Sequence, residues 1–146
     1  MTDYSIRPFA SAAAVRHVGE GLLKRTLPKA EWTHEAHLAA CTWLLLERLD
    51  IHPEAELPDI IRSYNEAVGG VNDDTQGYHE TLTQLYICGV RRHLAVDRSD
   101  DLLDVVNRLL ASPKGLRSWP LTHYSRELLF SVPARRGWIE PDIAPI

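Results

Sequence analysis

Cysteine and long apolar runs are scarce in this chain, and each shortage excludes a class of protein. The 146 residues include two cysteines, Cys41 and Cys88, which do not form a C-x-x-C pair. A zinc knuckle or thioredoxin-type motif is therefore excluded, and both thiols are expected to be free and buried. No apolar run approaches the roughly 20 residues that span a bilayer, and residues 1–10 lack a signal-peptide pattern. These absences predict a cytoplasmic protein that does not enter a membrane.

Positive charge is also in short supply. The chain carries 16 Lys and Arg against 20 Asp and Glu, which gives a net charge of −4. Nucleic-acid binding needs clustered basic residues that release counterions from phosphates. The two basic clusters, Arg91-Arg92-His93 and Arg135-Arg136, are too short to follow a phosphate backbone. We therefore expect no nucleic-acid partner.

The sequence lacks the period-two alternation of β-strands and instead repeats apolar residues at helical spacing. Ser11 and Thr33 have the chemistry of N-caps, Gly69-Gly70 has that of a helix stop, and Ser112-Pro113 ends a further helix. A composition of 45% hydrophobic and 25% charged residues is typical of one globular domain. We expect helices over residues 11–25, 34–49, 75–94 and 100–111, and a further one that starts near Pro53 or Pro58 and ends before Gly69.

The helical pattern loosens in the last thirty or so residues. One short helix is expected around residues 124–130, followed by an extended tail. Trp119, Tyr124, Phe130 and Trp138 give this region a large aromatic area, which is costly to leave in water. The sequence therefore predicts an all-α, single-domain protein over residues 1–146. We expect a bundle of four to five helices with the C-terminal segment packed across it.

Two histidines stand three positions apart at the start of the second predicted helix. His34 and His37 share one face with Leu38 and Cys41, so they head an apolar stripe and point toward the core. Glu35 lies about 100° away on the wheel and is expected to be a solvated first-turn charge.

The fourth predicted helix repeats this arrangement. His79 heads a face that continues through Leu82, Thr83 and Tyr86, while Glu80 lies to one side. The positive end of a helix dipole and burial both disfavour a charged imidazole, so we expect these histidines to be neutral. A neutral imidazole is the form that binds a metal or accepts a proton.

The two histidine-bearing helix starts define a candidate metal site. If they meet, His34, His37 and His79 could occupy three positions around a divalent transition metal, zinc or iron before others, with Glu80, water or substrate as the fourth ligand. The spacing matches neither H-E-x-x-H nor a pair of E-x-x-H motifs. An inward histidine in a bundle is also commonly a core residue held by hydrogen bonds, and that alternative stays open.

Three stretches resemble a family of short, uncharacterised bacterial proteins. They are WTHEAHL at 32–38, YNEAVGGVNDDTQGYHET at 64–81, and YSRELLFS followed by ARRGWIEPDIAPI at 124–146. The resemblance covers most of the chain and implies a whole single-domain protein. It implies no activity, and it groups the histidine-bearing stretches with the C-terminal tail. The residues it marks as site residues of unassigned role are His34, His37, Tyr78, His79, Glu80 and Thr81, with Tyr124, Ser125 and Arg126 closing the pocket.

These observations favour a small metal-dependent enzyme, a hydrolase, lyase or oxidoreductase, acting on a small polar substrate. Glu80, Tyr78 and Arg126 are the predicted catalytic residues: Glu80 would serve as fourth ligand or general base, and Arg126 would clamp a carboxylate or phosphate of the substrate. One alternative is a non-catalytic module that binds a small molecule in the same pocket. Another is an interaction protein that docks through its aromatic C-terminal tail. The sequence leaves open whether two chains share the site in a homodimer.

Overall fold

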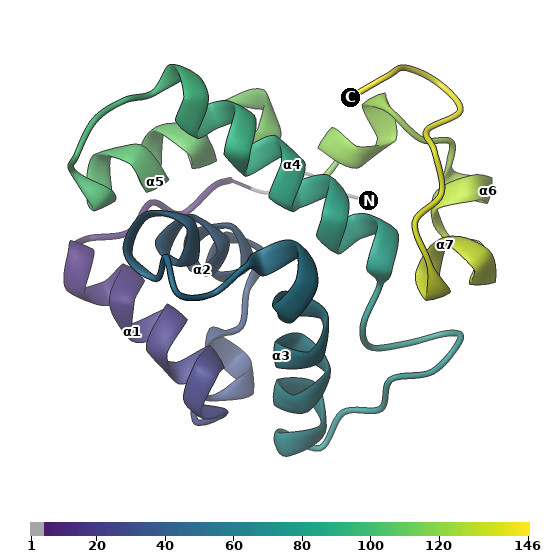
Figure 1. Ribbon diagram of the computed structural model, residues 1–146, viewed down its shortest axis with the longest axis horizontal. Helices are drawn as coiled ribbons and strands as arrows, with labels where there is room; N and C mark the ends of the chain where they lie inside the picture. The colour runs from purple at the N-terminus through teal and green to yellow at the C-terminus, as the bar shows by residue number, and fades with distance from the viewer. Residues whose placement is uncertain (1–4) are drawn as a thin grey trace.

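A computed structural model describes residues 5–146, and every regular element in this range is helical (Figure 1). The predicted all-α fold is confirmed. Five long helices make up the bundle: α1 (Ala12–Lys24), α2 (His34–Glu47), α3 (Pro53–Ala67), α4 (Glu80–Val96) and α5 (Leu102–Ala111). The shorter elements are η1 (Lys29–Glu31), η2 (Pro113–Gly115), η3 (Trp119–Thr122), α6 (Arg126–Leu129) and α7 (Val132–Arg136). Within the described range, no helix is both long and apolar enough to cross a bilayer.

Side-chain caps define where the helices begin. The Ser11 hydroxyl accepts a hydrogen bond from the Ala14 N–H at 3.1 Å, and the Thr33 hydroxyl accepts one from the Ala36 N–H at 3.2 Å. Each cap satisfies an amide that the first helical turn leaves without a partner. The predicted starts of α1 and α2 are therefore confirmed, and so is a left-handed glycine after α3, Gly69, with φ of 85°.

The predicted start of the fourth helix is wrong by five residues. Asp73 accepts hydrogen bonds from the backbone N–H groups of Thr75 and Gln76, and Gly77 adopts a left-handed φ of 81°. This aspartate turn competes with helix formation, because it offers the backbone a different set of partners. The helix consequently begins at Glu80, and His79 becomes its N-cap residue instead of a side chain on its first turn.

Helix α2 is the centre of the bundle and contacts each of the other four long helices. Its apolar residues lie all round the helix, which is the pattern of a helix enclosed by neighbours and not of one that covers a surface. The main core gathers around it. Fully buried members include Val15, Leu22, Ala39, Trp43, Leu44, Tyr64, Ile87, Val106 and Leu109.

A second, smaller core joins α4 to the C-terminal segment, which we define as residues 116–146. Leu85, Trp119, Tyr124 and Leu129 are all buried in it. The Tyr124 hydroxyl donates to the Ile139 carbonyl, and the Thr81 hydroxyl donates to the Gly137 carbonyl. The predicted packing of this segment across the bundle is confirmed, and Figure 1 shows it beside the start of α4. The single short helix expected there is divided into α6 and α7 by the Ser131 cap.

Helices α1 and α2 approach closely at Gly19. A Cβ atom placed there would overlap the ring of Trp43, which is 2% exposed. The absence of a side chain at this position is therefore a packing requirement, even though glycine within a helix lowers its intrinsic stability.

We expect Gly19→Ala to destabilise the protein by about 1–3 kcal/mol, because overpacking against Trp43 outweighs the gain in helix propensity of about 1 kcal/mol. Urea unfolding followed by circular dichroism measures the change. The same substitution in a Trp43→Phe background should cost less, because the benzo ring that meets the new Cβ is gone. A stabilised Gly19→Ala single variant would contradict this account of the α1–α2 contact.

Candidate functional site

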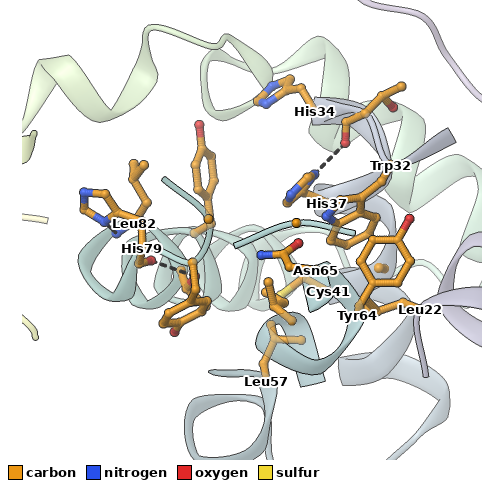
Figure 2. Close-up of a pocket in the computed structure, with 18 of the residues that line it drawn as sticks. Leu22, Trp32, His34, His37, Cys41, Leu57, Tyr64, Asn65, His79 and Leu82 are labelled. Carbon is orange, nitrogen blue, oxygen red and sulfur yellow. Dashed lines mark hydrogen bonds between the residues drawn. The ribbon is translucent and has the colours of Figure 1, made fainter. Parts of the chain in front are cut away.

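A pocket of about 740 Å³ lies between the start of α2, one face of α3 and the start of α4 (Figure 2). Its volume is within the range of about 300–1,000 Å³ that is usual for small-molecule sites. Most of its buried lining is apolar, and polar side chains gather toward the helix starts. The apolar group includes Leu22, Leu38, Cys41, Leu57, Ile61, Leu82 and Ile87, and the polar group includes Lys29, Thr33, His34, His37, Asn65, Gln76 and Arg117.

One wall of the pocket is the loop between α3 and α4, residues 69–78, which we call the pocket loop. Asn72 holds it in place. Its side-chain oxygen accepts hydrogen bonds from the Asn65 amide and the Tyr78 N–H, both at 3.0 Å, and its amide donates to the Arg62 carbonyl at 3.1 Å. A Cβ at Gly77 would overlap the Val71 carbonyl, so this position also requires glycine.

Helix α7 of the C-terminal segment braces the pocket loop from outside. Arg136 forms a two-pronged ion pair with Asp74 at 2.7 and 2.6 Å, and Arg135 donates to the Gly77 carbonyl at 3.0 Å. The sequence assigned this closing role to Tyr124, Ser125 and Arg126. Arg126 is instead exposed on α6 and does not line the pocket, so its predicted position is wrong.

His37 presents a free acceptor to the pocket. Its Nδ1 lies 2.6 Å from the Thr33 carbonyl oxygen. A carbonyl can only accept, so Nδ1 carries the proton and Nε2 carries the lone pair. No residue in the described chain donates a hydrogen bond to Nε2. The ring stacks on Trp32, with 3.8 Å between centroids and 30° between planes, and this contact fixes its orientation in the cavity.

The surroundings of His37 keep it neutral. His37 lines the pocket but is exposed, so the prediction that it points toward the core is wrong. Desolvation lowers the pKa of His37 to about 4, and the positive charge of nearby Arg117 acts in the same direction. The direction is the one expected for an imidazole at this helix start. At physiological pH the side chain is therefore an acceptor at Nε2 and a donor at Nδ1.

His34 has the opposite tautomer. Its Nε2 lies 2.7 Å from the Gly115 carbonyl oxygen, so Nε2–H donates there and Nδ1 carries the lone pair. The bond joins the start of α2 to η2, across 81 positions of sequence. His34 lines the pocket beside His37, but its N–H is used in the structural hydrogen bond to Gly115.

His79 uses both ring nitrogens in structural hydrogen bonds. Its Nδ1 accepts from the Leu82 N–H at 3.1 Å and caps α4, and its Nε2–H donates to the Leu129 carbonyl at 2.7 Å. The side chain is 7% exposed, and desolvation lowers its pKa. His79 thus links the start of α4 to the end of α6 through two hydrogen bonds, and neither ring nitrogen is available to a ligand.

The three histidines do not form a ligand set for a metal. In Figure 2, His79 lies on the far side of the pocket from His34 and His37. A metal on His79 would displace either the Nδ1 cap of α4 or the Nε2 bond to Leu129. Across residues 5–146, no three His, Cys, Asp or Glu side chains are arranged to hold an ion. The donor groups therefore do not fit the metal site that the sequence predicted.

Glu80 and Tyr78 interact mainly with each other. The Tyr78 hydroxyl donates to the Glu80 carboxylate at 2.8 Å, and the Gln84 amide donates to the same oxygen at 3.0 Å. Tyr78 lines the pocket, with the Arg62 guanidinium 4.4 Å from its ring centre. Glu80 does not line the pocket and instead borders a groove on the other side of α4. Its predicted place beside the histidines is wrong, since α4 begins later than expected.

Glu35 is buried, contrary to expectation. It is 7% exposed, one oxygen accepts from the Arg7 N–H at 3.2 Å, and the other lies 3.8 Å from an Arg117 nitrogen. The prediction of a solvated charge assumed that one face of α2 meets water. Since neighbouring elements also cover this side of α2, even this polar position is buried.

Sequence reasoning missed several residues that shape the pocket. Trp32 orients His37, Asn65 donates to Asn72 in the pocket loop, and Lys29 and Arg117 supply positive charge. These four residues have no local signal, whereas Asn72 has one, since an Asn in a Gly-flanked loop commonly bonds its own backbone. Comparisons with protein-family models, curated proteins and solved structures found no match to this chain. The resemblance to short bacterial proteins therefore stays a prediction.

We expect His79→Ala to lower the free energy of unfolding by about 2–3 kcal/mol, because it removes a helix cap and leaves the Leu129 carbonyl buried without a partner. His79→Asn should recover about 1 kcal/mol of this, since its shorter side chain can still cap α4. Denaturant unfolding of both variants measures the difference. Equal stability of wild type and His79→Ala would show that the two bonds contribute nothing.

The same bonds predict a pH dependence. The pKa of folded His79 lies below its ordinary value of 6.5, so its contribution is present above that pH and is lost as the pH falls below it. Between pH 7 and pH 5 the wild type should lose more stability than His79→Asn. Identical pH profiles would contradict the neutral cap.

The tautomers are directly measurable. Long-range ¹H–¹⁵N correlation spectra should show His37 protonated at Nδ1 and both His34 and His79 protonated at Nε2. The His37 signals should shift with a midpoint near pH 4, because its pocket disfavours the charged form. An Nε2-protonated His37, or a midpoint near the ordinary value of 6.5, would contradict the geometry described above.

Proposed function

We propose that this protein binds a small, largely apolar molecule in the pocket between α2, α3 and α4. The observation that carries the proposal is a mainly apolar cavity of about 740 Å³ with His37 in its lining, since the Nε2 lone pair of this residue has no described partner. Sites of this kind combine apolar walls with a few polar groups that orient the ligand. His37 would accept a hydrogen bond from a hydroxyl or N–H group of the ligand.

Binding has more support than acid–base catalysis. A general base works best when its pKa lies near the working pH, and the pKa of His37 is about 4. Cys41 also lines the pocket, but burial raises the pKa of its thiol to about 12, which disfavours the reactive thiolate. The groups that could react are both held in their unreactive forms, while a neutral imidazole remains a good acceptor.

The two other functions that the sequence suggested have less support. A metal-dependent enzyme built on His34, His37 and His79 would require His79 to give up one of its two structural hydrogen bonds. Docking through the aromatic tail would depend on Phe130 and Trp138, which are 48% and 40% exposed, because Trp119 and Tyr124 are already buried against α4. The pocket, by contrast, has in its lining a polar atom with no described partner, His37 Nε2.

A matched pair of probes tests the proposal. We expect 2-naphthol, which can donate a hydrogen bond, to bind more tightly than 2-methoxynaphthalene, which cannot. His37→Phe keeps an aromatic ring against Trp32 but loses the acceptor, so it should weaken 2-naphthol binding about 3- to 10-fold and leave the ether unchanged. Isothermal titration calorimetry measures both affinities.

His52→Phe is the control, since His52 is exposed and does not line the pocket. It should bind both probes as the wild type does. Equal affinity of wild type and His37→Phe for 2-naphthol would remove His37 from the site. Failure of both probes to bind the wild type would overturn the pocket proposal itself.

A further inference from the structure

We infer that the ligand of the pocket is an apolar diol, a neutral molecule whose two adjacent hydroxyl groups donate to His34 and His37. This inference rests on the proposed function and adds a second donor to the ligand. Two imidazoles from one helical turn line the same cavity, and each has a ring nitrogen to which no residue of the described chain donates.

Backbone carbonyls decide which atom of each ring is left for a ligand. The Gly115 carbonyl accepts from His34 Nε2–H at 2.7 Å, and the Thr33 carbonyl accepts from His37 Nδ1–H at 2.6 Å. A neutral imidazole has a single N–H, so the other nitrogen of each ring carries a lone pair. His34 Nδ1 and His37 Nε2 are therefore both acceptors, and a ligand that pairs with them must supply two donors.

The two acceptors are neighbours on α2. Residues three positions apart lie on one face of a helix, with about 5–6 Å between their Cβ atoms. The two rings also interact electrostatically, because charge on His34 lowers the pKa of His37. Aromatic contacts hold each ring: His37 stacks on Trp32 at 3.8 Å, and His34 meets Tyr86 edge-on at 6.1 Å between centroids. The lining thus presents a fixed pair of acceptors.

The other polar groups of the lining offer less to a ligand. Three hydroxyl groups already donate to protein oxygens, those of Tyr64, Tyr78 and Thr83. Arg117 is paired with buried Glu35 at 3.8 Å. Lys29 is exposed at η1, where water solvates its ammonium group. A ligand therefore gains more by donating to the imidazole pair than by accepting from these groups.

A charged donor fits the pocket less well than a neutral one. Among the described residues, no Asp or Glu lines the cavity to pair with an ammonium group. The pKa of His37, about 4, shows that its surroundings oppose positive charge. A carboxylate would meet the two lone pairs with further acceptors. Neutral hydroxyl groups avoid both costs.

Adjacent hydroxyls match the spacing of the imidazole pair. A single hydroxyl has one proton and can satisfy one ring nitrogen. Two hydroxyls on neighbouring carbons can each reach a separate acceptor through an O–H···N bond of about 2.8 Å. The apolar side of the cavity, which includes Leu38, Leu57 and Leu82, would then enclose the carbon skeleton.

Four naphthalene probes test the inference. Two have a pair of hydroxyls, adjacent in 2,3-dihydroxynaphthalene and at opposite ends in 2,6-dihydroxynaphthalene. 2-Naphthol has one hydroxyl, and 2,3-dimethoxynaphthalene has none. Each is titrated into the full chain by calorimetry at neutral pH, with and without EDTA. We expect the adjacent diol to bind about 3- to 10-fold more tightly than 2-naphthol or the 2,6-diol, with or without EDTA, and the dimethyl ether to bind most weakly.

Nitrogen chemical shifts test the contacts without any substitution. In long-range ¹H–¹⁵N spectra of the wild type, the adjacent diol should shift the signals of both His34 Nδ1 and His37 Nε2, whereas 2-naphthol should shift that of His37 Nε2 alone. His52 is exposed and does not line the pocket, so its signals should stay unchanged. A His34 Nδ1 signal that the bound diol leaves unmoved would overturn the inference.

Substitution of His34 measures its contribution. His34→Gln retains an amide N–H for the Gly115 carbonyl but loses the Nδ1 acceptor. It should weaken binding of the adjacent diol about 3- to 10-fold and leave 2-naphthol unchanged. His52→Gln is the matched control and should alter neither affinity. Unchanged diol affinity in a folded His34→Gln variant would remove His34 from the site.

The outcomes separate the two proposals. Equal affinity for the adjacent diol and the 2,6-diol, with 2-naphthol binding still sensitive to His37→Phe, would overturn the diol and leave the pocket standing. An advantage of the adjacent diol that disappears in EDTA would also overturn it, because a metal would then hold the hydroxyls. Failure of all four probes to bind would overturn both proposals.

Discussion

The enclosure of α2 is the constraint on which the rest of the structure depends. Because this helix is apolar all round, the other four long helices must each cover part of it, and the main core forms at these contacts. The cover ends at the first turn of α2, where His34 and His37 interrupt the apolar surface. The pocket lies where the enclosing helices leave that first turn uncovered, so its position follows from the packing of α2.

Histidine serves two purposes around this turn. His34 and His79 each donate to a carbonyl far away in sequence, Gly115 and Leu129, and so tie the C-terminal half of the chain to the helix starts. His37 donates to Thr33, only four residues away. A carbonyl partner for one ring nitrogen leaves the other as an acceptor in both His34 and His37, whereas His79 uses both nitrogens.

The pocket loop and the C-terminal segment form one structural unit. Asn72 fixes the loop from within, while Arg135 and Arg136 fix it from α7. The same segment buries Tyr124 and Leu129 against α4. The aromatic tail thus supports the wall of the pocket, and a change far from the cavity in sequence would be felt there through these contacts.

The sequence by itself determined the helical class, the caps at Ser11 and Thr33, the stop at Gly69 and the packing of the aromatic tail. These features depend on local chemistry: hydroxyl caps, glycine conformations, and apolar residues at helical spacing. It also located the stretches around His34 and around Tyr78, which both line the pocket. The later start of α4 could have been predicted from the local sequence, because Asp73 and Gly77 both lie in the loop just before it.

Only the tertiary structure decided what each histidine does. The partners of His34 and His79 are backbone carbonyls 81 and 50 positions away, and backbone carbonyls carry no sequence signal. The burial of Glu35 and the outward turn of Glu80 likewise depend on which faces other elements cover. Identical residue types became a helix cap, a tie between segments and a free acceptor, because long-range packing chooses the partner of each ring nitrogen.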